Sequence, residues 1–174
     1  MKTSNWMKRF AAIAGSALMG LMFATGANAA NPETITAEVT FVNPILITVP
    51  VALKFGLIDH NLATQTIIIG TDDLVTGTGT AFVIGGTQAA ASMTIGADTS
   101  QVLTFLIDAI SNGTGYALGT FVCSYDGGSD TACNSLTEVS VASATLLIGA
   151  TLTGDDAATP GNADGSFNIT VAYQ

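Results

Sequence analysis

Short segments rich in β-branched and aromatic residues, separated by turn formers, most strongly limit how this chain can fold. Residues 85–86, 112–115 and 126–128 are turn-forming clusters that recur at the spacing of a β-sandwich. Residues 103–110 alone are apolar enough to make a helix arguable, and the following Ser-Asn-Gly would end it. The segments expected to form strands are 35–41, 45–49, 66–69, 80–84, 93–95, 102–107, 121–122, 139–141, 145–148 and 167–173.

This pattern predicts an all-β protein, an immunoglobulin-like antiparallel sandwich of about nine strands. We expect a single domain over residues 30–174, because 145 residues suffice for one core and are too few for two ordinary domains.

The first 29 residues have the organisation of a secretory signal peptide. Lys2, Lys8 and Arg9 precede an apolar run over residues 10–24, and Ala27-Asn28-Ala29 forms a small-x-small cleavage site. The run is shorter than the roughly 20 residues that a bilayer span needs. We therefore predict cleavage after Ala29, a secreted product and no integral membrane segment in the mature chain.

Cleavage would make the protein strongly acidic. Residues 30–174 contain Lys54 as their one lysine, no arginine and all 13 carboxylates, a net charge of −12 with His60 neutral. Such a chain repels phosphate backbones and anionic lipid, so we expect no nucleic-acid partner and no docking on a lipid surface.

The two cysteines are expected to pair. Cys123 and Cys133 form an even set in an exported chain, and their spacing matches no CxxC motif. The pattern favours a structural staple across a hairpin or loop over redox or metal chemistry.

The sequence offers little for catalysis. His60 is the one histidine, and no GxSxG motif marks a serine nucleophile that could use it as a base. The surrounding Asp59-His60-Asn61 is typical of a polar loop with an exposed or capping histidine. We predict no catalytic residue, no cofactor and no enzyme activity.

Calcium is the more serious ligand to consider, because carboxylate-rich loops can bind it through oxygen. The candidates are Asp72-Asp73 and the segment 154–164, and neither has the order of an EF-hand loop. Solvated turns explain these aspartates better, so we assign no metal site. A glycan site would have to use the few tyrosines, Tyr116, Tyr125 and Tyr173.

The end of the chain alternates regularly between apolar and small or polar residues. Phe167, Ile169, Val171 and Tyr173 are apolar, which indicates a strand with one buried face. Counted from Gln174, Tyr173 is penultimate and Gly161 is fourteenth, an arrangement that resembles the C-terminal motif of chaperone–usher pilus subunits.

A wider resemblance includes the start of the mature chain. Leu53-Lys54-Phe55-Gly56 followed by residues 165–173 is similar to an uncharacterised family of secreted bacterial β-proteins, which itself resembles spore-coat-U-type subunits of archaic pili. In such subunits the sandwich lacks one strand, and a neighbour's N-terminal extension fills the gap. The resemblance implies a periplasmic chaperone and usher, self-polymerisation, and a location in the periplasm or in a fimbrium at the cell surface.

The donor strand implied by this resemblance lies in residues 30–41, and its alternating part is the segment 35–41. Ile35, Ala37, Val39 and Phe41 alternate there with polar residues. The same segment is equally compatible with an ordinary first strand of a complete fold. A self-complete domain is favoured by the late position of the cysteines and by the short stretch before Asn43-Pro44. Two functions stay open: a structural fimbrial or surface-matrix subunit, and a monomeric module that binds calcium or surface glycan.

Overall fold

The computed structural model describes residues 36, 38–155, 158–161 and 164–174, excluding the side chains of Val49 and Pro50. The predicted signal peptide, residues 1–29, lies outside this part of the chain. Phe41–Gln174 forms one compact unit. Its strands are β1 (Leu46–Val51), β2 (Leu57–Ile58), β3 (Thr66–Ile69), β4 (Val75–Thr76), β5 (Val83–Gly85), β6 (Ala91–Gly96), β7 (Val102–Ser111), β8 (Tyr116–Tyr125), β9 (Thr131–Ala132), β10 (Thr137–Val139), β11 (Ala144–Gly154) and β12 (Ser166–Tyr173).

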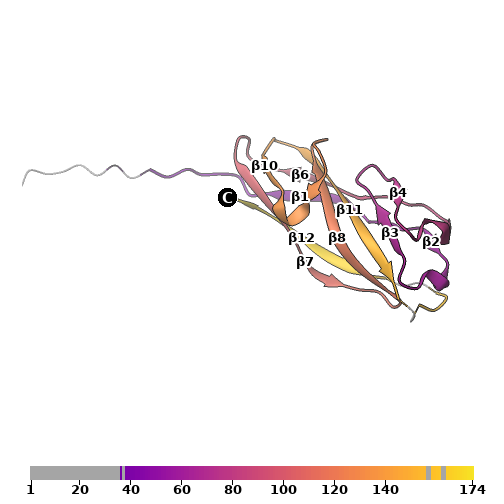
Figure 1. Cartoon of the computed structure of the whole chain (residues 1–174). Helices are drawn as coiled ribbons and strands as arrows, with labels where there is room; N and C mark the ends of the chain where they lie inside the picture. The colour runs from indigo at the N-terminus through magenta and orange to yellow at the C-terminus, as the bar shows by residue number, and fades with distance from the viewer. Residues whose placement is uncertain (1–35, 37, 156–157, 162–163) are drawn as a thin grey trace, which may run out of the picture. The chain divides into compact units, whose positions relative to one another are not determined.

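The larger sheet is built around β11. One edge of β11 pairs with β8, and the other pairs with β6 along its first half and with β3 along its second half, all antiparallel (Figure 1). Strand β1 extends this sheet beyond β6. Alternate β11 residues are buried because one face of the strand covers the core: Ala144, Leu146, Ile148, Ala150 and Leu152.

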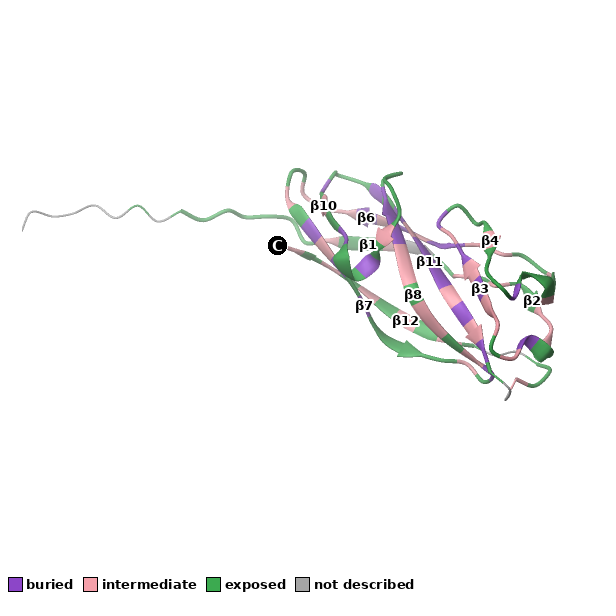
Figure 2. Cartoon of the chain, viewed as in Figure 1, coloured by how far each residue is buried: buried purple, intermediate pink, exposed green. Residues whose placement is uncertain are grey.

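The second sheet has the order β10-β7-β12 and packs its apolar face against the first. In β7, Leu103, Phe105 and Ile107 are buried, whereas Val102 and Leu106 are exposed (Figure 2). This alternation has the period of a strand, so the helix considered for residues 103–110 is not formed. The fold is the predicted all-β, immunoglobulin-like antiparallel sandwich.

Three of the expected strands differ from the structure. The strand expected at 139–141 shares only Val139 with β10 (Thr137–Val139). Thr80–Phe82, predicted as part of a strand, forms a short 3-10 helix (η2) before β5, with the Phe82 N–H donating to the Gly79 carbonyl at 2.9 Å. This turn directs Phe82 onto a second, smaller core around Leu62 and Ile67. At residues 35–41, the described positions 36 and 38–41 are in no strand, and the first strand of the sandwich begins at Leu46.

The structure also has more strands than the predicted nine or so. The additional strands within the described residues are the two- and three-residue pieces such as β2, β4 and β9. They have too few residues to show a period in the sequence.

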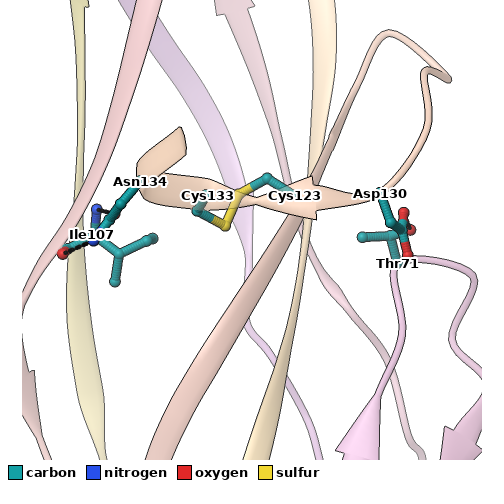
Figure 3. The surroundings of a disulfide bond; sticks show 6 residues. All are labelled: Thr71, Ile107, Cys123, Asp130, Cys133 and Asn134. Carbon is teal, nitrogen blue, oxygen red and sulfur yellow. Dashed lines mark hydrogen bonds between the residues drawn. A yellow bond between two sulfur atoms is a disulfide. The ribbon is translucent and has the colours of Figure 1, made fainter. Parts of the chain in front are cut away.

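The predicted disulfide is confirmed. Cys123 in β8 is bonded to Cys133 in a 3-10 helix, η3 (Cys133–Ser135), with their Cα atoms 4.9 Å apart. Next to it, Asn134 accepts a hydrogen bond from the Ile107 N–H of β7 at 2.6 Å, and Thr71 donates to Asp130 at 2.5 Å (Figure 3). The bridge therefore holds the chain where it passes from one sheet to the other.

We expect the double variant C123S/C133S to lose about 2 to 3 kcal/mol of unfolding free energy, because the bridge closes a short loop in the unfolded chain. Urea unfolding with and without reductant measures this loss. Reductant should destabilise the wild type and leave the double variant unchanged. Equal stability of wild type and variant under oxidising conditions would contradict a stabilising role for the bridge.

Candidate assembly surface

The strand order reproduces six of the seven strands of a constant-type immunoglobulin domain. That fold has strands A, B, E and D in one sheet and C, F and G in the other. Here β1-β6-β11-β8 corresponds to A-B-E-D, and β7-β12 corresponds to C-F. Along the chain these six strands also follow one another in the order A to F. Within the described residues no strand takes the position of G, so β12 pairs with β7 on one edge alone.

Strand β12 presents an apolar face to the core. Phe167, Ile169, Val171 and Tyr173 are half-buried and pack against the main core, while the residues between them are exposed. Phe167 contacts Phe121 of the opposite sheet with ring centroids 4.8 Å apart. These core-facing residues are half-buried rather than buried because one side of their strand has no neighbour. Gly161 lies outside the strand, in the preceding loop, at a φ of +144°.

In the part of the chain that the structure describes, β1 likewise pairs on one edge alone, with β6. Ile47 lies opposite the fully buried Ile95 of β6 and so shares its core-facing side, yet 37% of Ile47 is exposed. Pro50 in this strand has no N–H to donate, which is tolerated at a sheet edge. We call the unpaired edges of β1 and β12 the open edges.

The open edges meet at one end through hydrogen bonds of Tyr173. The Asp98 N–H donates to the Tyr173 hydroxyl at 2.8 Å, and this hydroxyl donates to the Asn43 carbonyl at 2.9 Å. Asn43 in turn donates its backbone N–H to Asp98 Oδ2 at 2.6 Å and its side-chain amide to Asp98 Oδ1. This Tyr173 cluster joins the end of β12 to the segment before β1.

The opposite side of the sandwich is protected against strand addition. Glu138 of the edge strand β10 lies opposite the buried Leu103, so it is on the core-facing side of its sheet. An inward charge on an edge strand opposes pairing with another chain. Strands β1 and β12 contain no charged residue. The open edges therefore lack this protection.

Within the described residues, the side-chain contact that the structure gives His60 is to Asp59. His60 is half-exposed at the start of a 3-10 helix, η1 (His60–Leu62), and its Nδ1 is 3.4 Å from Asp59 Oδ1. Asp59 caps this helix by accepting a hydrogen bond from the backbone N–H of Asn61. This bond stabilises the carboxylate and so holds the pKa of Asp59 below its ordinary value. The polar loop predicted here is a capped turn.

Two of the aspartates considered for calcium, Asp72 and Asp73, accept hydrogen bonds from the backbone. Asp72 accepts from the Leu74 N–H at 3.0 Å, and Asp73 accepts from the Ala90 N–H at 2.7 Å. Among the described residues, no three histidine, cysteine or acidic side chains are grouped to hold a metal. Part of the second candidate segment, including Asp156, lies outside the described residues.

The three tyrosines do not form a shared stacking surface. Tyr125 is buried against Phe105, with burial raising its pKa, and Tyr116 belongs to the second core. Tyr173 is held in its hydrogen-bonded cluster.

Sequence reasoning found the apolar residues of β12 and missed the partners of Tyr173. Asn43 and Asp98 are far from Tyr173 in the sequence. The available signal was a tyrosine at the end of an apolar strand face, because such a hydroxyl normally finds a hydrogen-bond partner.

These features define a class of protein: a disulfide-linked antiparallel sandwich with two unpaired edges on one side. The chain belongs to the family described as Domain of unknown function (DUF4402), whose model matches residues 45–173. No curated protein and no solved structure was found to match the chain. The part of the chain that the structure describes has no helix long and apolar enough to cross a membrane.

We expect Phe167→Ala to lower the unfolding free energy by about 1 to 3 kcal/mol, less than a fully buried phenylalanine, because the ring is half-exposed in the isolated subunit. Thr170→Ala, on the exposed face of the same strand, is the matched control and should change it by less than about 0.5 kcal/mol. Urea unfolding measures both. Equal effects of the two variants would contradict the assignment of the two faces.

Removing the hydroxyl in Tyr173→Phe should cost about 1 to 2 kcal/mol, since the Asp98 N–H and the Asn43 carbonyl both lose a partner. Hydrogen exchange should show faster exchange of the Asp98 amide. In Tyr125→Phe, whose hydroxyl accepts from the Val141 N–H at a longer 3.4 Å, the Asp98 amide should exchange as in the wild type. Unchanged protection of Asp98 in Tyr173→Phe would show that the cluster does not hold this end.

Proposed function

We propose that the protein is a non-enzymatic, secreted structural subunit of a fimbrium or surface matrix, and that subunits assemble by donating a strand to the open edges of a neighbour. The observation that carries the proposal is the incomplete cover of core-facing residues at both edges, Ile47 on β1 and Ile169 on β12. An added strand would pair its backbone with these edges and bury the exposed apolar surface.

The segment before the sandwich suits the role of donor. Val39 is 71% exposed and Phe41 is 88% exposed in their own chain, although both are large apolar residues. Ile35 and Ala37, the other two members of the alternating set, lie outside the described residues. In a neighbour's sandwich the four residues could occupy the core-facing side, leaving Thr36, Glu38 and Thr40 on the outer side.

The resemblance of the C-terminal strand to chaperone–usher subunits extends the proposal to export. Before assembly, a periplasmic chaperone would cover the open edges, and an usher would pass the subunit to the surface. Exposed edges without protective charges need such a cover, since they are templates for uncontrolled pairing. The residues assigned to this step are Gly161, Phe167, Ile169, Val171 and Tyr173.

The test uses cells that produce the full chain. Their sheared surface fraction is run on a denaturing gel with and without boiling. A ladder that collapses to one band on boiling is expected, because a donated strand dissociates slowly. Val39→Asp would place a charge on the core-facing side of the donor and should abolish the ladder. Thr40→Asp changes the outer side of the same segment and should leave it.

Two results would overturn the proposal. A single band for the wild type in both lanes would indicate a self-complete secreted monomer and direct the search to calcium and surface glycan. A ladder that is equally strong in Val39→Asp would show that residues 35–41 are not the donor.

A further inference from the structure

Lys54 lies on the continuation of the open edge of β1. Its backbone N–H donates to the Ala89 carbonyl at 2.8 Å, and the Ala89 N–H donates to the Lys54 carbonyl at 2.9 Å. This antiparallel bridge extends the pairing between β1 and β6 beyond Val51. Because both backbone groups of Lys54 face Ala89, those of its two neighbours are oriented toward the open side.

The Lys54 side chain is on the outer face of this edge. Leu53 packs against the main core and Phe55 against the second core, so the residue between them points away from both. Lys54 is exposed, and in the described part of the chain no carboxylate is within ion-pair distance of its amine. It is also the one lysine or arginine of residues 30–174.

The alternating part of the proposed donor, residues 35–41, carries one charge, and this charge has the opposite sign. Glu38 is the one charged residue between positions 34 and 53. It alternates with the apolar residues of the segment, so a donor strand with its apolar side toward the core would present Glu38 on the outer face. Lys54 and Glu38 would then lie on the same face of neighbouring strands, whichever direction the donor runs.

We propose that Lys54 binds Glu38 of the neighbouring copy and thereby sets the register of the donated strand. This inference rests on the proposed function. Directly opposite side chains on neighbouring strands have Cβ atoms about 5 Å apart, and diagonal neighbours about 7 to 8 Å, both within reach of a lysine. A slip of one residue turns Glu38 toward the core, and a slip of two moves it by about 7 Å along the edge.

The net charge makes this pair selective. With −12 on each mature subunit, approach of two copies is unfavourable almost everywhere on their surfaces. Lys54 is the one point of attraction for a segment that carries a carboxylate. Charged pairs of this kind contribute more to register and partner choice than to affinity.

The experiment is a charge swap in the full chain, read as the half-time for dissociation of the ladder at a fixed elevated temperature. Lys54→Glu and Glu38→Lys should each shorten it by about fivefold, because each places like charges in neighbouring strands. The double variant K54E/E38K should return to within about twofold of the wild type. High salt should reduce the differences.

Glu33 provides the matched control, since it precedes the alternating residues 35–41 and is in the opposite phase to Glu38. E33K is the same charge change, and combining it with K54E should give no recovery. Thermal unfolding of each isolated subunit, which should be unchanged, separates a folding defect from an assembly defect. Should a reversal fail to fold, Lys54→Gln and Glu38→Gln replace it, and each should shorten the half-time less than a reversal does.

The outcomes distinguish this inference from the proposed function. A wild type without a ladder overturns the proposed function, and the present inference with it. A wild-type ladder whose half-time is unchanged in both single variants overturns the Lys54–Glu38 pair and leaves strand donation standing. Single variants that shorten the half-time without recovery in K54E/E38K overturn the pair as well, because the two residues then act through other partners.

Discussion

The backbone of a strand has hydrogen-bonding groups along two edges. In β12 one edge pairs with β7, and within the described residues the other edge has no partner strand. In the complete fold a seventh strand, G, lies beside F in the C-F-G sheet, and here the strand in the F position is β12. The missing neighbour also leaves core-facing side chains partly exposed. Ile47 and the apolar residues of β12 face inward and are still partly exposed, because cover by a neighbouring strand is missing on one side.

The two sides of the sandwich are therefore different. On one side, the Cys123–Cys133 bridge and Asn134 hold the passage between the sheets, and Glu138 gives the edge strand β10 an inward charge. On the other side, the Tyr173 cluster joins the sheets at one end, and the remainder of β1 and β12 has no charge and no covalent constraint. An inward charge opposes strand addition on the first side, and β1 and β12 contain no such charge.

The sequence predicted the architecture well where local pattern and burial agree. The alternation of residues 167–173 identified β12 and its core-facing side, and the even cysteine count identified the bridge. Residues 80–84 are predicted as a strand because they are rich in β-branched and aromatic residues. Tertiary packing of Phe82 onto the second core produced a 3-10 helix instead.

What the sequence could not provide is which edges lack a neighbour, because pairing is a property of segments far apart in the chain. The contacts of Asn43 and Asp98 with Tyr173 span most of the domain, and no local pattern indicates them. The same applies to Lys54, which the sequence shows as a lone cation and the structure places on an open edge. Under the proposed strand donation, this one lysine would influence the choice of partner more than any single apolar contact. Apolar burial would stabilise registers that differ by two residues alike, and a charge pair would stabilise one of them.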